Sequence, residues 1–489
     1  MTPGTAATIC VPLSDSRANV KIWARTSRPG FAVTSPRRCS TLSSSTTTPV
    51  TGQNHLWSVD EHVDDILGTV RPLEPIELQL LDAQGCVLVE DVTVPVSLPP
   101  FDNSSMDGYA VRVADVAGAS EEFPAVLTVI GDVAAGAGAG PTVGAGQAAR
   151  IMTGAPLPPG AEAVVPVEWT DGGLGEGPVS GMRAHSAAPE GASGEVRVHR
   201  PAEARAHVRA RGSDVQAGDR ALTAGTVLGA PQIALLAAIG RGTVKVRPRP
   251  RVVVMSTGSE LIQPGEELAE GQIYDSNSFA LTAAARDAGA IAYRVGAVAD
   301  DAETLRSTIE DQLIRADLIV TTGGVSVGAY DVVKEALSAI GDPDDEEGIG
   351  AGSGVEFRKL AMQPGKPQGF GSIGPDHTPL LALPGNPVSS YVSFEIFVRP
   401  AIRALMGLPE VHRPTTRAEL VADKALGSPE GRRQFLRGKY DAEAGEVTPV
   451  GGSGSHLIAA LAHADALIVV PEATTSVEPG TDVEVVLLG

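Results

Sequence analysis

Residues 317–334 read DLIVTTGGVSVGAYDVVK, and this stretch decides the fold. The apolar run 318–320 predicts a buried strand, the turn 321–324 ends it, and the periodic segment 329–340 predicts a helix. A strand that stops at glycines and continues as a helix directs backbone N–H groups and the positive end of a dipole to one spot, which suits an anion. Asp331, in the first helical turn, can hold a metal beside it. The alternative is a plain turn whose glycines serve packing only.

The pattern of alternating strands and helices continues on both sides of this stretch, from Val252 to about residue 408. It predicts a doubly wound α/β domain with a mostly parallel sheet. Glycine turns STG, TTGG and PGNP follow three of the strands, and the segment PGKP adds Lys366. Since such turns lie at the carboxyl ends of strands, we expect them to converge on one rim of the sheet. Backbone N–H groups, hydroxyls and one cation would hold a phosphate or another tetrahedral oxyanion there.

The other segments differ in pattern from the α/β domain. Residues 77–92 favour a helix followed by a strand, and 230–240 favour a helix. Short β-branched runs between Gly and Pro predict a small β domain over about 113–200 and another after Pro409. Within 96–112, the turn-forming sequence DNSSMDG carries two carboxylates, Asp102 and Asp107, which can also simply cap their own backbone.

Composition excludes several classes of protein. A formal charge of -21 disfavours a general nucleic-acid or anionic-membrane partner. The sequence contains no run of 18 apolar residues, so no membrane span is expected. The three cysteines are scattered, which argues against a disulfide framework or a cysteine-based zinc site. The sequence contains no Walker A, HExxH, CxxC or GxSxG motif. Carboxylates, hydroxyls and glycine turns remain, which suit magnesium-assisted handling of phosphate or oxyanion.

The first 54 residues form a segment of different character. They contain six Lys or Arg residues and one acid, Asp15, and then run into TLSSSTTTPVTG. This composition predicts a disordered leader and also matches an organelle transit peptide, whereas the lack of an apolar core disfavours secretion.

A set of motifs along residues 56–489 resembles the molybdopterin molybdenumtransferases, the MoeA or gephyrin E-domain family. The motifs occur in the family's order: PPFDNSSMDGYAVR, ARIMTGAPLP, STGSEL, QIYDSN, TTGGVSVGAYD, QPGKP, LPGNPVSSY, GRRQFLRG and GSGSH. The resemblance implies insertion of molybdate into adenylylated molybdopterin with release of AMP. It also implies a Mg²⁺-dependent reaction in the cytoplasm.

The resemblance further implies a homodimer of multidomain α/β plus β chains. The expected parts are a leader at 1–54, an elongated mixed α/β domain I at 55–95 plus 196–245, an inserted β domain II at 96–195, a MogA-like doubly wound domain III at 246–408 with the pterin site, and a β-barrel-like domain IV at 409–489. Domain I is thus a mixed, segment-swapped domain. The site would lie between the α/β domain of one chain and the β domain of the other.

The site residues implied by the motifs fall into three groups. The catalytic group is Asp107, Asp331, Ser326 and Lys366, with Asp107 acting from the neighbouring subunit. The substrate-binding group is Thr153, Ser256, Thr257, Gly258, Gly323, Gly324, Gly365, Pro367, Asn386, Ser389, Arg437 and Ser455. The metal ligands are Asp331, Glu260 and Asp275.

Three positions depart from the family pattern: Ser213, Ser259 and Gln363 stand where many members carry an ionisable residue. Other activities also remain open at this point. They are tungstate insertion, adenylyl transfer to molybdopterin, and a pterin-binding scaffold without catalysis. A molybdopterin adenylyltransferase is the expected pathway partner, and neither nucleic acid nor a membrane is expected.

Overall fold

The computed structural model describes residues 56–489 apart from several gaps. The gaps are residues 137, 139, 176, 180, 182–193, 300, 326–332, 334–335 and 338–353. The leader predicted over 1–54 therefore lies outside the described residues, and the helix predicted over 329–340 lies mostly outside them.

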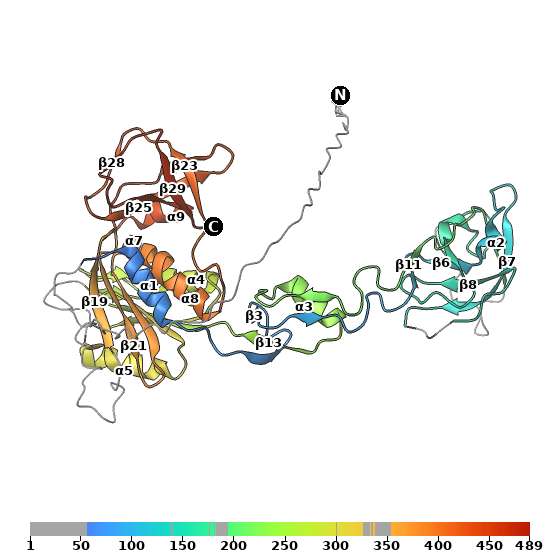
Figure 1. Cartoon of the computed structure of the whole chain (residues 1–489), viewed down its shortest axis with the longest axis horizontal. Helices are drawn as coiled ribbons and strands as arrows, with labels where there is room; N and C mark the ends of the chain where they lie inside the picture. Colours follow the sequence, from blue (N-terminus) through green and yellow to red (C-terminus); the bar gives the residue numbers. More distant parts are fainter. Residues whose placement is uncertain are drawn as a thin grey trace, which may run out of the picture. The chain divides into compact units, whose positions relative to one another are not determined.

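A seven-stranded sheet forms the framework of the α/β region (Figure 1). Its strands, in spatial order, are β1 (Leu56–Trp57), β19 (Gly354–Leu360), β21 (Pro367–Ile373), β22 (Thr378–Leu383), β18 (Leu318–Thr322), β14 (Arg251–Thr257) and β17 (Ile291–Val298). β22, β18, β14 and β17 are mutually parallel, whereas β21 runs antiparallel to both β19 and β22. The strands that are followed by glycine turns, β14, β18 and β22, are therefore parallel, and the antiparallel strand β21 lies toward one edge of the sheet.

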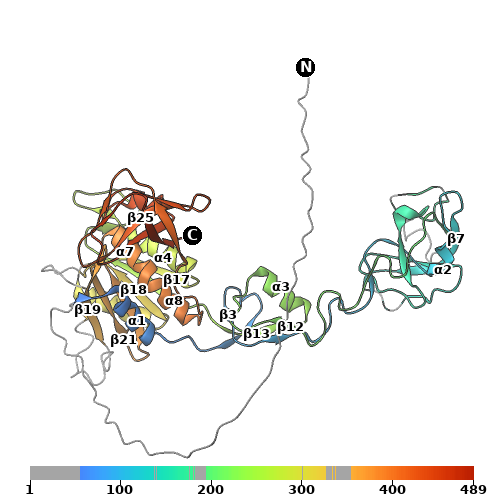
Figure 2. The same ribbon diagram turned by 45° about the horizontal axis from the view of Figure 1, so that its top comes forward.

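Helices cover both faces of this sheet, because alternate residues of its central strands enter two separate clusters. Val252 and Val254 of β14 pack into one cluster, and Val253 and Met255 pack into the other. The first cluster includes residues of α1 (Val59–Thr69), α4 (Asn277–Asp287), α7 (Pro387–Ser393), the π-helical turn η3 (Phe394–Val398) and α8 (Arg399–Leu405); the second includes α5 (Ala302–Leu313). Figure 2 shows the first group of helices together beside the sheet. This layering confirms the predicted doubly wound α/β domain.

The C-terminal region is a closed barrel of five strands. Its strands are β23 (Thr415–Leu420), β25 (Arg433–Asp441), β26 (Glu446–Pro449), β27 (Ala466–Val470) and β29 (Asp482–Leu487). Each pairs with two others, and the β25–β27 pairing closes the circle. β20 (Met362–Gln363) of the α/β region adds to β25, β24 (Leu426–Gly427) pairs with β28 (Ser476–Val477), and the short helix α9 (Ile458–Ala462) precedes β27. The predicted β-barrel-like domain is thereby confirmed.

A second sheet region contains five strands in the order β10-β7-β8-β6-β9. These are β10 (Gly194–Val198), β7 (Ala125–Val133), β8 (Gln147–Ile151), β6 (Gly108–Val111) and β9 (Ala163–Pro166), with the helical segments α2 (Val113–Val116) and η1 (Val167–Trp169) and the small pair β5 (Asn103–Ser104) and β11 (Val208–Arg209). Its core residues are mainly Val and Ala. Asp107 precedes the central strand β6.

A smaller three-stranded sheet joins two distant stretches of the chain. It contains β2 (Ile76–Gln79), β13 (Thr243–Arg247) and β3 (Val87–Leu88), accompanied by α3 (Ala230–Ala238) and the pair β4 (Val92–Thr93) and β12 (Arg220–Leu222). The helix expected at the start of 77–92 was wrong. Those residues form β2 because pairing with β13, about 165 residues later, overrides the weak local preference.

No helix among the described residues has the length and apolar character needed to cross a membrane. The helix α1 begins at a capping box formed by Ser58 and Glu61. The hydroxyl of Ser58 accepts from Glu61 N at 3.1 Å, and the carboxylate of Glu61 accepts from Ser58 N at 2.7 Å. This reciprocal cap fixes the entry of α1 onto the sheet.

A buried histidine lies on the inner face of α1. His62 is 1% exposed, packs edge-on against Phe397 at 4.8 Å between ring centres, and has its Nδ1 3.3 Å from Nη1 of Arg358. Burial and then the positive charge of Arg358 lower the pKa of His62 from 6.5 to about 3. The imidazole is therefore neutral in the folded chain near neutral pH.

This depressed pKa predicts a loss of stability in acid. Below pH 6.5 the unfolded chain binds a proton at His62 that the folded chain does not bind until about pH 3. As the pH falls from 6.5 toward 3, His62 should therefore lower the free energy of unfolding by about 1.4 kcal/mol for each pH unit. His62→Leu should remove this contribution, measured as the difference from wild type in denaturant unfolding at pH 7 and pH 4.5. The control His463→Leu, at an exposed histidine, should leave the pH dependence of the free energy of unfolding unchanged. If His62→Leu also left it unchanged, the lowered pKa of His62 would be contradicted.

Candidate functional site

The three glycine turns line one cleft of about 870 Å³. They follow β14, β18 and β22, which are neighbours in the sheet and run parallel, so their carboxyl ends open at the same edge. Two further loops, 363–367 and 455–456, complete the lining. The lining residues are Thr257, Gly258, Glu260, Leu261, Ile273, Tyr274, Asp275, Ser276, Asn277, Thr322, Gly323, Gly324, Val325, Gln363, Pro364, Gly365, Lys366, Pro367, Pro384, Gly385, Asn386, Pro387, Ser389, Ser455 and His456.

Gly323 and Gly324 form the tightest corner of the cleft. Their φ angles of 102° and 64° favour glycine. A Cβ on Gly323 would lie 2.4 Å from the carbonyl oxygen of Thr257, so only glycine lets this backbone approach the neighbouring turn. The hydroxyl of Thr257 faces the same corner; it is buried and has no hydrogen-bond partner among the described residues. A buried hydroxyl beside open glycine backbone is a ready hydrogen-bond donor for a bound oxyanion.

A hydrogen-bond network ties the turns to one another. The side-chain amide of Asn277 donates to the carbonyl of Gly385 at 2.6 Å and to Oγ1 of Thr322 at 3.2 Å. The hydroxyl of Thr322 donates to the carbonyl of Pro384 at 2.9 Å and lies 2.9 Å from Oγ of Ser390. The start of α4, the end of β18 and the turn before α7 are therefore held in fixed positions.

Asp275 is a fully buried carboxylate behind the rim. Its Oδ1 accepts from Oγ of Ser256 at 2.8 Å and from the backbone N–H of Ser278 at 3.1 Å, and its Oδ2 accepts from the hydroxyl of Ser278. Nη1 of Arg294 lies 3.6 Å from Oδ2. Asp275 thus joins the end of β14 to the start of α4, and binding a metal would require it to exchange one of these partners.

The loop that carries Lys366 is held in place by hydrogen bonds to Gln368 and Leu360. Gln368 is buried, and its side-chain amide donates to the carbonyl of Gly365 at 2.7 Å and to Oγ of Ser393 at 2.6 Å. The carbonyl of Lys366 accepts from Leu360 N at 2.7 Å. Lys366 is the one Lys or Arg among the described residues of the lining, so it supplies the direct positive charge of the cleft.

The barrel contributes the loop with Ser455 and His456. The backbone N–H of Val388, in the first turn of α7, donates to the carbonyl of Ser455 at 3.0 Å. This contact brings a hydroxyl and an imidazole from the C-terminal region to the rim of the α/β sheet.

Arg437 holds this loop from behind without lining the cleft. It is 2% exposed, and its guanidinium donates to the carbonyl of Gly454 at 3.3 Å and to that of Gly452. Its Nε has no hydrogen-bond partner among the described residues. Burial lowers the pKa of Arg437, yet an arginine side chain stays protonated in proteins. The sequence predicted substrate contact for Arg437, and the contacts in the structure are with the loop that carries Ser455.

The structure brings most of the predicted site residues together in this cleft, although their roles stay predictions. Those that line it are Thr257, Gly258, Glu260, Asp275, Gly323, Gly324, Gly365, Lys366, Pro367, Asn386, Ser389 and Ser455. Ser256 and Arg437 are buried behind its walls. Ser326 and Asp331 lie outside the described residues.

Asp107 and Thr153 lie together in the five-stranded region and are not part of the described lining. Oδ1 of Asp107 accepts from Thr153 N at 2.6 Å and from Oγ1 of Thr153 at 2.8 Å. The two residues flank the antiparallel pair β6 and β8. Thr153 therefore fixes the orientation of the Asp107 carboxylate, and no hydrogen bond from the described part of the chain reaches Oδ2.

The sequence reasoning missed several lining residues. Asn277, Thr322 and His456 belong to motifs that had been recognised, QIYDSN, TTGG and GSGSH, whereas Gln363 had been named only as a departure from the family pattern. Their position within those motifs was the available signal. Tyr274 also lies in QIYDSN, so the same signal was available for it.

The oxygen ligands available for a divalent cation are few in the described part of the cleft. No group of three or more His, Cys, Asp or Glu side chains with metal-binding geometry occurs among the described residues. Glu260 lines the cleft, and the unpartnered hydroxyl of Thr257 lies at the glycine corner. This set fits Mg²⁺, which usually takes one or two carboxylates and completes its shell with substrate phosphates and water.

Three family profiles match successive parts of the chain. The MoeA N-terminal region (domains I and II) matches residues 57–240, the probable molybdopterin-binding domain matches 253–404, and the MoeA C-terminal region (domain IV) matches 419–488.

Several known proteins are similar to this chain over most of its length. Molybdopterin molybdenumtransferase 2 of Mycobacterium tuberculosis is 45% identical over 428 residues, which are 88% of this chain and 98% of that protein. The molybdopterin molybdenumtransferase of Bacillus subtilis is 33% identical over 88% of this chain and 94% of its own length. A crystal structure of the molybdopterin biosynthesis MoeA protein from Pyrococcus horikoshii superposes with a TM-score of 0.65 at 32% identity, covering 89% of this chain and all of that one.

The contacts of Arg437 predict that it acts through the Ser455 loop. In Arg437→Met, amide hydrogen exchange over 452–456 should accelerate, and phosphate should bind the cleft about tenfold more weakly. The free energy of unfolding should change by only about 1–2 kcal/mol, because the lost hydrogen bonds are offset by removal of a desolvated charge.

The matched control is Arg417→Met in the same barrel, since Arg417 is exposed and pairs with Asp482 at 2.5 Å. That variant should leave both the exchange of 452–456 and phosphate binding unchanged. Normal loop protection in Arg437→Met would contradict the proposed anchoring.

Proposed function

This chain belongs to the MoeA family, and on that premise we propose that it is a molybdopterin molybdenumtransferase. It inserts molybdate into adenylylated molybdopterin and releases AMP. The observation that carries this conclusion is the single cleft built from three glycine turns, Lys366 and the Ser455 loop of the barrel. Such a cleft has room for two anionic groups, as the reaction requires for molybdate and the substrate phosphates.

The reaction itself needs positioning more than a protein nucleophile. Two sulfur atoms of the pterin dithiolene replace two oxide ligands of molybdate, which leave as water after taking up protons. Water cleaves the phosphoanhydride bond to AMP. Because the substrates supply the sulfur and the metal, the chain's own task is to hold two anions at a fixed separation.

The residues of the cleft suit that task. The Gly323–Gly324 corner and the hydroxyl of Thr257 hold phosphate oxygens, as backbone nests do elsewhere. Lys366, Ser389 and Ser455 bind the second anion from the facing loops. Lys366 opposes the repulsion that a chain of net charge -21 exerts on anions.

Mg²⁺ is proposed as the cofactor, held by Glu260 together with Asp331 and the substrate phosphates. When bound, it supplies positive charge beside the phosphoanhydride. Asp275 is a further proposed ligand, and its hydrogen bonds to Ser256 and Ser278 support a role in positioning the end of β14 and the start of α4 as well.

We also propose that the chain acts as a homodimer in the cytoplasm. In this arrangement Asp107 of one subunit reaches the cleft of the other. The support is that Asp107 has a carboxylate oxygen left over after its bonds to Thr153, while the described cleft contains few carboxylates of its own. A molybdopterin adenylyltransferase would supply the adenylylated substrate.

The alternatives are weaker. An adenylyltransferase needs only the α/β region, whereas this chain also matches the two other MoeA regions. A scaffold without catalysis is disfavoured because the similar proteins from Mycobacterium tuberculosis and Bacillus subtilis are named molybdopterin molybdenumtransferases. Tungstate has the same shape and charge as molybdate, and no described residue favours one of them.

The direct test is an insertion assay with purified chain, adenylylated molybdopterin, molybdate and Mg²⁺. We expect AMP and active molybdenum cofactor to appear together, and both to be lost on chelation of Mg²⁺. AMP release without cofactor, or cofactor formed only with tungstate, would contradict the proposed activity.

The shared site predicts complementation between inactive subunits. Asp107→Asn keeps the oxygen that accepts from Thr153 but removes the charge, and Lys366→Met removes the cation of the cleft. Each variant alone should fold and lose insertion activity. Mixed and reassorted, they should regain up to about a quarter of wild-type activity, because half of the dimers then contain one intact site.

Circular dichroism and size-exclusion chromatography should show each variant folded and dimeric. If the mixture stays inactive although heterodimers are demonstrated by mass spectrometry, the two residues act in the same subunit and the shared site is wrong.

A further inference from the structure

The roles proposed for the cleft leave the imidazole of His456 without a task. His456 lines the cleft next to Ser455 and is exposed to solvent. It is the one histidine among the described residues of the lining. Because imidazole changes its charge between about pH 5 and 8, a histidine can both accept and donate a proton near neutral pH.

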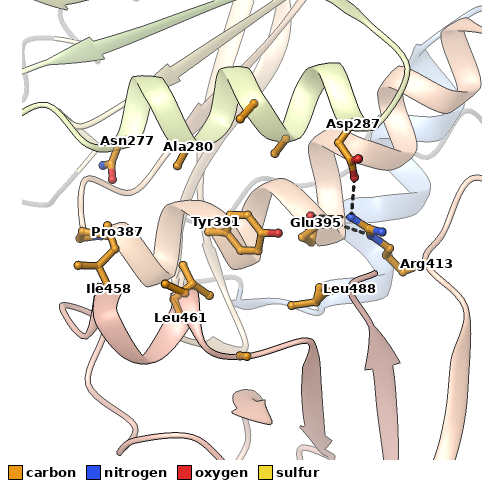
Figure 3. Close-up of a pocket in the computed structure, with 14 residues that line it drawn as sticks. Asn277, Ala280, Asp287, Pro387, Tyr391, Glu395, Arg413, Ile458, Leu461 and Leu488 are labelled. Carbon is orange, nitrogen blue, oxygen red and sulfur yellow. Dashed lines mark hydrogen bonds and ion pairs between the residues drawn. The ribbon is translucent and has the colours of Figure 1, made fainter. Parts of the chain in front are cut away.

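The backbone on both sides of His456 is held in place. Before it, the carbonyl of Ser455 accepts from the N–H of Val388 in α7 at 3.0 Å. After it, the N–H of Ile458 donates to the carbonyl of His456 itself at 2.9 Å. Ile458 and Pro387 of α7 line a neighbouring hollow together (Figure 3). The imidazole is therefore presented at the rim of the cleft by a backbone that α7 fixes.

The imidazole ring lies close to the backbone of Gly454. A Cβ at this glycine would come within 3.0 Å of Cε1 and 3.3 Å of Nδ1 of His456. The carbonyl of Gly454 accepts from the buried guanidinium of Arg437 at 3.3 Å, so a positive charge lies behind the loop. The other charged groups of the described lining are Lys366, Glu260 and Asp275.

The other ionisable side chains of the described lining are of types that exchange protons poorly at neutral pH. Lys366 and Tyr274 carry an ammonium and a phenol, which are weak acids, whereas carboxylic acids such as Glu260 and Asp275 have mostly lost their proton. Imidazole is intermediate in acid strength. In the described part of the cleft, His456 is therefore the side chain whose type suits proton exchange.

The proposed reaction requires protons to move within the cleft. Molybdate, a dithiol and two further protons give a dioxomolybdenum dithiolene and two molecules of water. The two thiols supply half of the hydrogen in that water, so two protons come from another source. Hydrolysis of the phosphoanhydride consumes one water and gives two phosphate monoesters, which as dianions leave two protons behind. The two halves of the reaction balance if protons pass from one to the other.

We propose that His456 passes these protons from the water that attacks the phosphoanhydride to the oxide ligands that leave molybdate. The imidazole accepts a proton from that water, and the imidazolium then donates it to an oxide. Each oxide takes one proton from a thiol and one from His456 and departs as water. The electron pair of the broken Mo–O bond stays on oxygen, and sulfur supplies the pair of the new bond, so no redox partner is needed. Two transfers complete one turnover.

This inference rests on the proposed function and adds a catalytic residue to it. The test is a single-turnover insertion assay with the full chain at saturating molybdate. His456→Ala should slow AMP release and insertion together by about a hundredfold, the usual range for a lost acid–base group. Its dissociation constant for molybdate, measured by isothermal titration, should stay close to that of the wild type.

Two further variants accompany His456→Ala. His456→Gln keeps an N–H donor but cannot exchange a proton, so it should be as slow as His456→Ala. The matched control is His463→Ala, since His463 is an exposed histidine of the same region and does not line the cleft. This control should insert molybdenum at the wild-type rate.

Chemical rescue separates proton transfer from a structural role. Because His456 is exposed, added imidazole can reach the space left in His456→Ala and should raise its rate about tenfold or more. The 1,3-dimethylimidazolium ion has the same ring and a positive charge but no N–H proton, so it should not rescue the variant.

Each outcome decides the proposal. It is overturned if His456→Ala inserts at the wild-type rate, if weaker molybdate binding accounts for the loss, or if imidazole fails to rescue the variant. Equal rescue by 1,3-dimethylimidazolium also overturns it, since the ring then acts by its charge or shape. An inactive wild type overturns the proposed function together with this role, whereas an active wild type matched by His456→Ala overturns the role of His456 alone.

Discussion

The close approach of three backbone turns is the constraint on which the site depends. Gly323 lies so near the β14 turn that a side chain there would overlap the carbonyl of Thr257, and a Cβ on Gly385 would lie 3.4 Å from Cα of Gly323. Leu383 O accepts from Gly323 N at 3.1 Å, which locks two of the turns together. With Asn277 joining the third element, hydrogen bonds within the chain hold the described part of the corner in place without a ligand. A preorganised anion site of this kind binds without first having to order its own loops.

The convergence of these turns could be predicted from sequence because it follows from local signals. Glycines at strand ends, and the rule that parallel strands open at one edge, were sufficient. Ser455 and Arg437 were different: GSGSH is a polar loop in a β domain, and only the contact between Ser455 and Val388 brings it to another region's rim. Family resemblance supplied Ser455, while the buried position of Arg437 required the fold. The helix predicted at the start of 77–92 was wrong for the same reason, since the strand found there depends on a partner about 165 residues away.

The net negative charge of the chain makes each positive charge near the cleft important for attracting an anion. A protein of net charge -21 repels molybdate and phosphates over the range that salt does not screen. One lysine at the rim provides direct attraction. Arg437 adds a positive charge behind the loop carbonyls. Because it is buried in a region of low dielectric constant, its electrostatic field is weakly screened toward the cleft. Its lack of a carboxylate partner among the described residues leaves that charge uncompensated. The local potential can therefore be positive although the surface as a whole is acidic.

The barrel changes what the α/β region can bind. By itself the α/β region presents a glycine corner and Lys366. Closing the barrel against α7 adds Ser455 and His456 on the far side of the rim and places α9 opposite α4. The first addition creates room and ligands for a second anion, and the second creates an apolar wall. Under the proposed function, molybdate enters the cleft as a second anion beside the substrate phosphates, and the barrel loop supplies groups that face it. The barrel is thus the element that extends the rim of the sheet into a two-sided cleft.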